Sequence, residues 1–436
     1  MDDLLAARLQ MAVSLGFHMI FATIGIGMPL LMVIAEGAWL RTREPVWLEL
    51  ARRWGKGTAI VFVVGAVSGT VLSFELGLLW PAFMEHAGPI IGMPFSLEGF
   101  AFFFEAIFLG IYLYGWQRVP AVAHWLAGVG VWVSGTLSGM FVVTANAWMN
   151  TPAGFTLAPD GSVATVDPFA AMMNPSAFAQ VLHMTVAAFL ATGWLVAGIH
   201  AWLLLSDRDN AFHRRALALC LAVATTCTVL QPITGHRVGR AVAENQPVKL
   251  AALEGLWESQ RRAPFTLGGW PDEDAEITRY AIEVPALLSW VAFGDADAEV
   301  MGLKDVPADE RPPVAVVHVA YQTMLATAAA MGATSVAAVV LAFVRRRVPP
   351  LDPWFLKCVV ATGPLGIVGI EAGWTATEVG RQPWIVYGWM RTADAVTPVP
   401  NLAITFSLVV ALYVGLGILC LVLLRRQFLN SPSFPA

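Results

Sequence analysis

Two histidines, a methionine and several glutamates lie inside long apolar stretches of this 436-residue sequence. Ionisable groups are costly in lipid, so they usually face a cavity, a partner or a ligand. His18, His183 and Met324 are of types that bind haem iron, and the 17 Trp and 24 Phe could line a macrocycle slot. A His183/Met324 pair would fill both axial positions and transfer electrons. A His or Glu ligand with the opposite side open would let oxygen bind.

Each of these residues also has an ordinary structural interpretation. A membrane histidine often forms a hydrogen bond between helices, and Met324 is one of 16 methionines, which commonly fill gaps in a core. Glu98 and Glu105 lie seven residues apart, on one helix face and about 10 Å from each other. This spacing suits a proton path, and it suits a solvated face equally well. His124, at the start of an apolar stretch, is assigned no role.

The elements that position these residues are membrane-spanning helices. The chain is 57% hydrophobic and 13% charged, whereas soluble domains carry about 25% charged residues. Runs of about 20 apolar residues cross a bilayer as helices. The sequence therefore predicts an all-α polytopic membrane protein, with residues 1–436 forming a single transmembrane domain. The nine predicted spans lie near residues 10–36, 55–80, 95–117, 124–149, 177–205, 216–234, 314–345, 354–375 and 402–425.

Basic residues follow the odd-numbered spans, whereas the connections 81–94 and 150–176 contain no Lys or Arg. The positive-inside rule then predicts an outer N-terminus and a cytoplasmic C-terminus. The acidic start of the chain has no cleavable leader pattern, so the first helix is expected to stay. With this orientation nearly all intramembrane polar groups fall in the outer half, and the inner half has little besides His200.

The long segment 235–312 is predicted to form an outer loop between spans six and seven. Asn245 can cap a helix that has Pro247 in its first turn. An apolar stripe follows, suited to lying on the membrane surface, and consists of Leu250, Leu253 and Trp257. The four cysteines lie in apolar stretches, so no disulfide framework is expected. The net charge of −5 suggests no nucleic-acid partner.

Several motifs together resemble subunit I of the cytochrome bd ubiquinol oxidases over nearly the whole chain. The most specific is GRQPW at 380–384, within EAGWTATEVGRQPW. The others are LEGFAFFFEAIFLGIYLYGW in the third span, NQPVKLAALEGLWESQ in the outer loop, and His18 in the first helix.

The resemblance implies three haem groups, two haem b and one haem d, although the third could be another haem b. His183 and Met324 match the axial ligands of the low-spin haem b. Glu378 matches the ligand of the high-spin haem b, and His18 matches the ligand of haem d. Trp374 belongs with these cofactor-binding residues.

The resemblance also implies the residues that handle protons and quinol. Lys249 and Glu254 match the pair that binds and oxidises quinol, and they lie five residues apart, so they are not an ordinary helix ion pair. Glu98 lies near the haem d iron or ligates it, and Glu105 resembles a member of a proton path from the cytoplasm. Arg381 lies close to the high-spin haem.

The implied activity is that of a quinol:oxygen oxidoreductase in the bacterial inner membrane. It would oxidise ubiquinol or menaquinol at the outer face and reduce O₂ to water with cytoplasmic protons. A homologous second subunit and small single-span subunits are the expected partners, in contact with membrane lipid.

Three features depart from the familiar pattern of this family. The outer loop is short, which indicates the short-loop branch. Gln322 stands where the pattern has Arg, two residues before Met324. Glu98 and Glu105 are one residue closer than in the best-known members, so their alignment requires a local helix irregularity.

A different class of protein remains as the alternative. A secondary transporter would use the intramembrane carboxylates to couple ions, and it predicts discontinuous helices and repeat symmetry, neither of which is evident in the sequence. A haem–copper oxidase is disfavoured because the chain contains no adjacent His-His pair.

Overall fold

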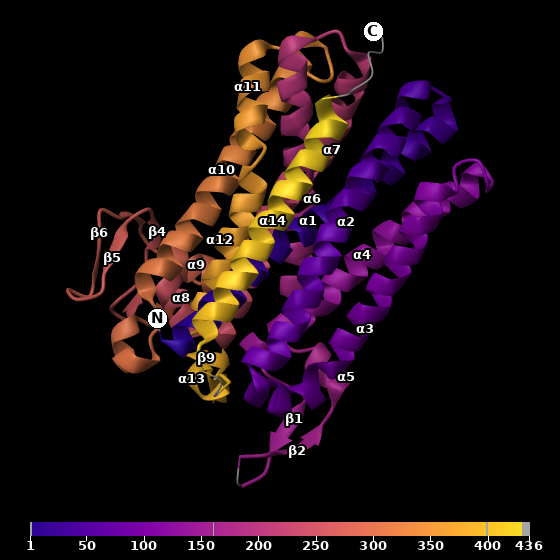
Figure 1. Cartoon of the computed structure of the whole chain (residues 1–436). Coiled ribbons are helices and arrows are strands. Elements are labelled where there is room, and N and C mark those ends of the chain that lie inside the picture. The colour runs from indigo at the N-terminus through magenta and orange to yellow at the C-terminus, as the bar shows by residue number, and fades with distance from the viewer. Residues whose placement is uncertain (1, 160, 398–399, 430–436) are drawn as a thin grey trace.

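The computed structural model describes residues 2–159, 161–397 and 400–429. Within these residues, nine helical segments are long and apolar enough to cross a membrane, which confirms the predicted number. They run alongside one another, and the start of the first helix and the end of the last helix lie at opposite ends of the bundle (Figure 1). The segments are α1 (Asp3–Thr42), α2 (Pro45–Leu79), α3 (Pro81–Tyr114), α4 (Ala121–Asn150), α6 (Ala177–Ser206), α7 (Ala211–Asn245), α10 (Val314–Arg345), α11 with α12 (Pro353–Val379) and α14 (Leu402–Leu429).

Several helices are longer than the sequence predicts. The interpretation of 81–94 as a loop is wrong, because α3 begins at Pro81 and includes Pro89 and Pro94. Proline is well tolerated in the first helical turn, and buried Phe83 and Ile90 hold the rest of this segment against the protein. α7 is also longer than predicted. It continues to Asn245, so the outer loop begins after residue 245 and not at residue 235.

The eighth span is interrupted, contrary to the expectation of continuous helices. It consists of α11 (Pro353–Thr362) and α12 (Leu365–Val379). Pro364 has no N–H to continue the ladder, yet Gly363 and Pro364 both keep helical dihedral angles. The interruption is therefore a proline kink. A Cβ on Gly198 of α6 would come within 3.0 Å of the Gly363 Cα, so both glycines permit close helix contact at the kink.

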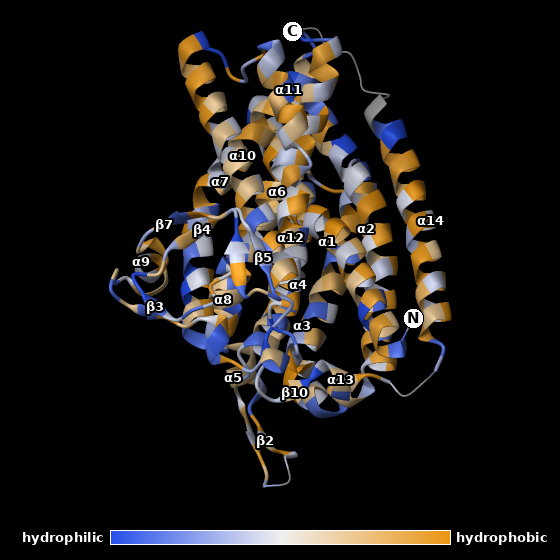
Figure 2. Ribbon diagram, turned by 90° about the vertical axis from the view of Figure 1, so that its left-hand side faces the viewer, coloured by the Kyte–Doolittle hydropathy of each residue, from blue (hydrophilic) through white to orange (hydrophobic). Residues whose placement is uncertain are grey.

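The helices form two groups joined through α1. One group contains α2, α3 and α4, and the other contains α6, α7, α10, α11 and α12. α14 packs on α1 and α2 at the periphery and is the least buried span. Hydrophobic residues dominate the long middle of the bundle, and hydrophilic residues gather toward its ends and in the loops (Figure 2). This distribution is the one expected for a protein whose solvent is lipid.

The outer loop is a small folded unit between α7 and α10. It contains α8 (Pro247–Glu254), α9 (Leu287–Phe293), two short 3₁₀ turns and three two-stranded antiparallel sheets. The pairs are β3 (Gln260–Arg261) with β8 (Glu299–Val300), β4 (Phe265–Leu267) with β7 (Ile282–Val284), and β5 (Trp270–Asp272) with β6 (Ile277–Arg279). The remaining short elements are β1 (Phe155–Leu157) with β2 (Val163–Val166), β9 (Trp384–Val386) with β10 (Met390–Arg391), α5 (Pro168–Met172) and α13 (Thr392–Ala395).

Two details predicted for this loop are corrected by the structure. Pro247 does begin α8, but Gln246 precedes it without a side-chain cap, and Asn245 belongs to α7. Leu250 and Trp257 are buried in a core that the loop shares with α7 and α10, so they do not form a stripe on the membrane surface. Because these apolar side chains pack against the helices, they are not available to contact lipid.

Candidate functional site

A chain of hydrogen bonds joins the outer loop to the end of α12. The Lys249 Nζ donates to the Asn150 Oδ1 at 2.5 Å, and the Asn150 amide donates to the Asn146 carbonyl at 3.0 Å. The Asn146 amide in turn donates to one oxygen of Glu378, whose other oxygen accepts from Arg381 at 2.5 Å. Three of these residues were identified from the sequence, whereas Asn146 and Asn150 on α4 were missed. Their four-residue spacing on one helix face was the available signal.

The two cations of this hydrogen-bonded chain are deeply buried. Lys249 is 4% exposed and Arg381 is 2% exposed. Burial lowers the pKa of Lys249 well below its usual range, the nearby Arg381 lowers it further, and Glu378 partly offsets both effects. The Arg381 NH1 has no hydrogen-bond partner among the described residues. A buried cation with a free donor is costly, so this position suits an additional anionic group.

Glu254 lies at the end of α8, against β4 and α10. Its Oε2 accepts a hydrogen bond from the Thr266 amide at 2.9 Å, and Tyr321 interacts with the same carboxyl. Burial raises the pKa of Glu254 to about 7, although both contacts oppose the rise. Lys249 and Glu254 thus point to different elements, which confirms that they are not a helix ion pair. A carboxyl with this pKa can accept and release a proton near neutral pH.

The GRQPW motif begins where α12 ends and touches the Lys249 side chain. A Cβ on Gly380 would come within 3.0 Å of the Lys249 Cγ and 3.2 Å of its Cε. The absence of a side chain at this position lets the lysine stem lie across the motif toward Asn150. The outer loop and the end of α12 therefore pack closely against each other at Gly380.

His18 lies between α1 and α2. Its Nδ1 is 3.0 Å from the Ser68 Oγ, and a Cβ on Gly69 would come within 2.9 Å of the His18 Cε1. A partner at Nδ1 orients the ring and fixes the tautomer, as is usual for an imidazole that ligates a metal through Nε2. Gly69 provides the space for the His18 ring. That His18 binds an iron stays a prediction.

Glu98 and Glu105 of α3 both face α4. The Ser138 hydroxyl donates to Glu98 at 3.2 Å, and a Cβ on Gly135 would come within 3.0 Å of the Glu105 carboxyl. Glu105 is 6% exposed, so its carboxyl lies inside the protein. Its participation in a proton path stays a prediction.

His183 and Met324 lie on different helices of the second group. The His183 Nδ1 is 3.0 Å from the Thr234 Oγ1 of α7, and the Gln231 amide is 3.2 Å from its Nε2. Met324 lies against α12, where a Cβ on Gly373 would come within 3.0 Å of its sulfur. A small residue therefore leaves room beside the thioether. That both side chains bind one iron stays a prediction.

The chemistry of these donors fits haem better than a bare metal ion. Among the described residues, no three His, Cys, Asp or Glu side chains gather as an ion site. A haem needs only one or two protein ligands because the macrocycle supplies four nitrogens. The Trp374 Nε1 and Glu371 Oε1 are also buried without partners in the described part of the chain. These unpaired groups near α12 are consistent with a further polar group there.

The half of the bundle that is predicted to face the cytoplasm contains more polar groups than the sequence suggested. Glu36 is fully buried, and its Oε1 lies 2.7 Å from the Nδ1 of His124, whose Nε2 contacts the Tyr112 carbonyl at 2.8 Å. The expectation of little besides His200 in this half is therefore wrong. Glu36 is at the end of predicted span one and His124 is at the start of predicted span four, so both were predicted to lie on the same side of the membrane. That shared position is the signal that was overlooked.

Gln322 occupies a defined place between α10 and the outer loop. Its amide donates to the Thr266 carbonyl at 2.9 Å, and its Oε1 accepts from the Gly268 amide at 2.9 Å. His318, one turn earlier, contacts the carbonyls of Leu253 and Gly268 at 2.8 and 2.9 Å. At the position where the resemblance leads one to expect Arg, this chain thus has a side chain that anchors the loop backbone.

Comparisons with known proteins agree with this arrangement. The family model described as cytochrome bd terminal oxidase subunit I matches residues 6–432. A putative cytochrome bd menaquinol oxidase subunit I of Bacillus subtilis (strain 168) is 35% identical, with 99% of this chain and 98% of the relative covered. The cytochrome bd ubiquinol oxidase subunit 1 of the same strain is 31% identical, with 98% and 94% covered. The bd oxidase structure from Geobacillus thermodenitrificans is similar with a TM-score of 0.93 and 39% identity, over 99% of both chains.

Proposed function

Since this chain belongs to the cytochrome bd terminal oxidase subunit I family, we propose that it oxidises a quinol at the outer membrane face and directs the electrons to oxygen. The nine apolar helices of the described residues, together with the family, place it in the bacterial inner membrane as a multi-pass oxidoreductase subunit. The single observation that supports the site assignment is the hydrogen-bonded chain from Lys249 to Glu378. It connects the proposed quinol site with a proposed haem ligand.

We assign the quinol headgroup to α8, whose Lys249 meets the end of α12 and whose Glu254 meets β4 and α10. Lys249 can donate a hydrogen bond to a quinol oxygen, and Glu254 can accept a quinol proton because its pKa is about 7. Both side chains belong to the outer loop, so protons released there leave on the outer side. The quinol is either ubiquinol or menaquinol.

Four residues are proposed to hold haem. His183 with Met324 would hold a low-spin haem b, Glu378 a high-spin haem b, and His18 a haem d or a third haem b. When bound, these groups supply one-electron transfer and oxygen reduction. Trp374 and Arg381 each have a buried donor with no partner among the described residues, so they are suited to hydrogen-bond polar groups at the edge of a macrocycle.

The proton supply for oxygen reduction is proposed to come from the cytoplasmic side. Glu105 and Glu98 are in line on the α4-facing side of α3, and Ser138 touches Glu98. Carboxyl and hydroxyl groups spaced along one face can relay protons through intervening water. Because protons leave on the outer side and enter from the cytoplasm, charge is separated without a pump.

The experiment is oxygen consumption with reduced quinone by the purified complex, which contains the second subunit that the family name implies. Asn150→Ala removes the acceptor of Lys249 and interrupts the chain, so quinol oxidation should fall by at least tenfold. Asn245→Ala is the matched control, since that amide bonds only to the carbonyl of Ala241 on its own helix among the described residues. Equal activity of both variants would refute the role of the chain.

A further inference from the structure

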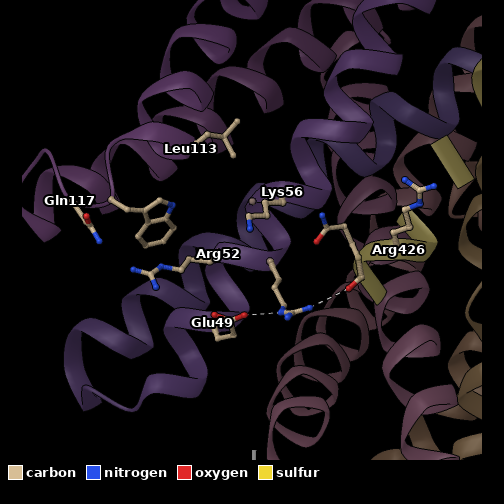
Figure 3. Close-up of a pocket in the computed structure, with 10 residues that line it drawn as sticks. Glu49, Arg52, Lys56, Leu113, Gln117 and Arg426 are labelled. Atoms are coloured by element: carbon tan, nitrogen blue, oxygen red, sulfur yellow. Dashed lines mark hydrogen bonds and ion pairs between the residues drawn. The ribbon is translucent and has the colours of Figure 1, made fainter. Parts of the chain in front are cut away.

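A basic cavity opens at the end of the bundle opposite the outer loop. Its volume is about 570 Å³, within the range of ligand-binding cavities. Figure 3 shows Arg52 and Lys56 of α2 and Gln117 beyond α3 around it, with Arg426 of α14 on the other side. The lining residues are Glu49, Arg52, Arg53, Gly55, Lys56, Leu113, Trp116, Gln117, Arg426 and Gln427.

The charges that line the cavity are not balanced. Four cationic side chains face one carboxylate, Glu49, which pairs with Arg53 at 2.8 Å. The Arg52 guanidinium lies 5.1 Å from the centre of the Trp116 ring, so it is positioned without a carboxylate. Among the described residues, Lys56 and Arg426 form no ion pair. The cavity therefore presents an excess of positive charge that is available to an anion.

The position of the cavity indicates the kind of anion. The positive-inside rule assigns this end of the bundle to the cytoplasmic surface, where anionic lipid headgroups are concentrated. Basic cavities between transmembrane helices on this side suit phosphate headgroups, because guanidinium groups bind phosphate oxygens in pairs and ammonium groups act as point charges. Leu113 and the Trp116 ring add apolar surface, which suits the glycerol and upper acyl part of a lipid.

We propose that this cavity binds a phosphate group, in the membrane the headgroup of an anionic phospholipid. Arg52 and Lys56 hold it from α2, and Arg426 closes the site from α14. None of these side chains belongs to the quinol loop or to the proposed haem ligands, so the site is independent of the catalytic residues. Binding ties the peripheral α14 to α2 through a shared ligand.

The test compares lipid retention by purified complexes. Lys56→Gln with Arg426→Gln removes two cations from the cavity. Arg346→Gln with Arg347→Gln removes the same charge from exposed positions after α10 on the same side. Each complex is placed in nanodiscs with increasing phosphatidylglycerol in phosphatidylcholine, and bound lipid is counted by native mass spectrometry after gentle extraction.

The cavity variant should bind phosphatidylglycerol more weakly, by roughly fivefold for each cation removed, whereas the control variant should match the wild type. A second arm adds inorganic phosphate to all three proteins in phosphatidylcholine and measures the thermal shift of each. A shift that depends on Lys56 and Arg426, without lipid retention, would support phosphate binding from a soluble source. Equal retention and equal shifts in all three proteins would overturn the proposal. So would loss of the second subunit from the cavity variant alone, which would assign the cavity to an acidic segment of that subunit.

Discussion

The Glu254→Gln substitution separates the proton chemistry of the outer loop from its folding. Glutamine keeps the shape of the side chain and can still accept the Thr266 amide, which lies 2.9 Å from the Glu254 Oε2. It cannot take up a proton from quinol. We therefore expect quinol oxidation to fall by roughly 10²-fold or more, while haem absorbance stays unchanged.

The magnitude of a second effect follows from the raised pKa. Burial moves the Glu254 pKa from 4.5 to about 7, so ionising it in the closed loop costs on the order of 3 kcal/mol. As pH rises, Glu254 loses its proton first in the locally unfolded (open) loop, where its pKa is 4.5. At intermediate pH the folded (closed) loop therefore binds more protons than the open loop. Loop stability is therefore fully present below pH 4.5, declines as pH rises, and levels off above about pH 7.

The assay is amide hydrogen exchange of the peptide that contains Thr266, corrected for intrinsic rates. Between roughly pH 5 and pH 8 the wild-type loop should lose about 2–3 kcal/mol of protection, and Glu254→Gln should lose none. Glu258→Gln, an exposed neighbour paired with Lys304 at 2.6 Å, should behave as the wild type. If protection declined with pH equally in the wild type and in Glu254→Gln, the assignment of this proton to Glu254 would be refuted. Loss of haem absorbance in Glu254→Gln would give the residue a structural role.

Three further predictions concern the bundle. Met324→Leu should change packing stability by less than about 1.5 kcal/mol, but a reduced-minus-oxidised spectrum should show loss of the low-spin haem band and a lower potential; an unchanged band and potential would leave Met324 a core residue. Glu105→Leu should slow oxygen reduction by roughly 10²-fold after normal quinol binding in a flow-flash measurement, and unchanged turnover would remove it from the proton path. Gly69→Val should displace the His18 ring, which a Cβ would already approach within 2.9 Å, and reduce haem content, whereas Gly77→Val on the same helix, with no atom within 4 Å of its Cβ, should retain it. Equal haem content in the two glycine variants would contradict the placement of His18.

Composition and hydrophobic run length determined the fold class without a structure. A bilayer offers no hydrogen-bond partners to a bare backbone, so long apolar runs must be helices. The nine spans were counted correctly for that reason. The boundaries were less well predicted, since Pro81, Pro89 and Pro94 indicate a break in the sequence but are accommodated within α3. Tertiary contacts of buried side chains such as Phe83 decide that outcome, and a local pattern does not contain them.

The residue types of the candidate site were also accessible from the sequence, because intramembrane His, Met and Glu are costly and therefore conspicuous. The partners that orient them were not. Asn146 and Asn150 acquire their role only when α4 meets the end of α12 and the loop helix α8, and Glu36 meets His124 only when α1 packs against α4. A hydrogen bond depends on distances of a few tenths of an ångström between groups far apart in the chain. Sequence alone thus determined which side chains had to leave lipid, and the packing of the helices decided which of them meet.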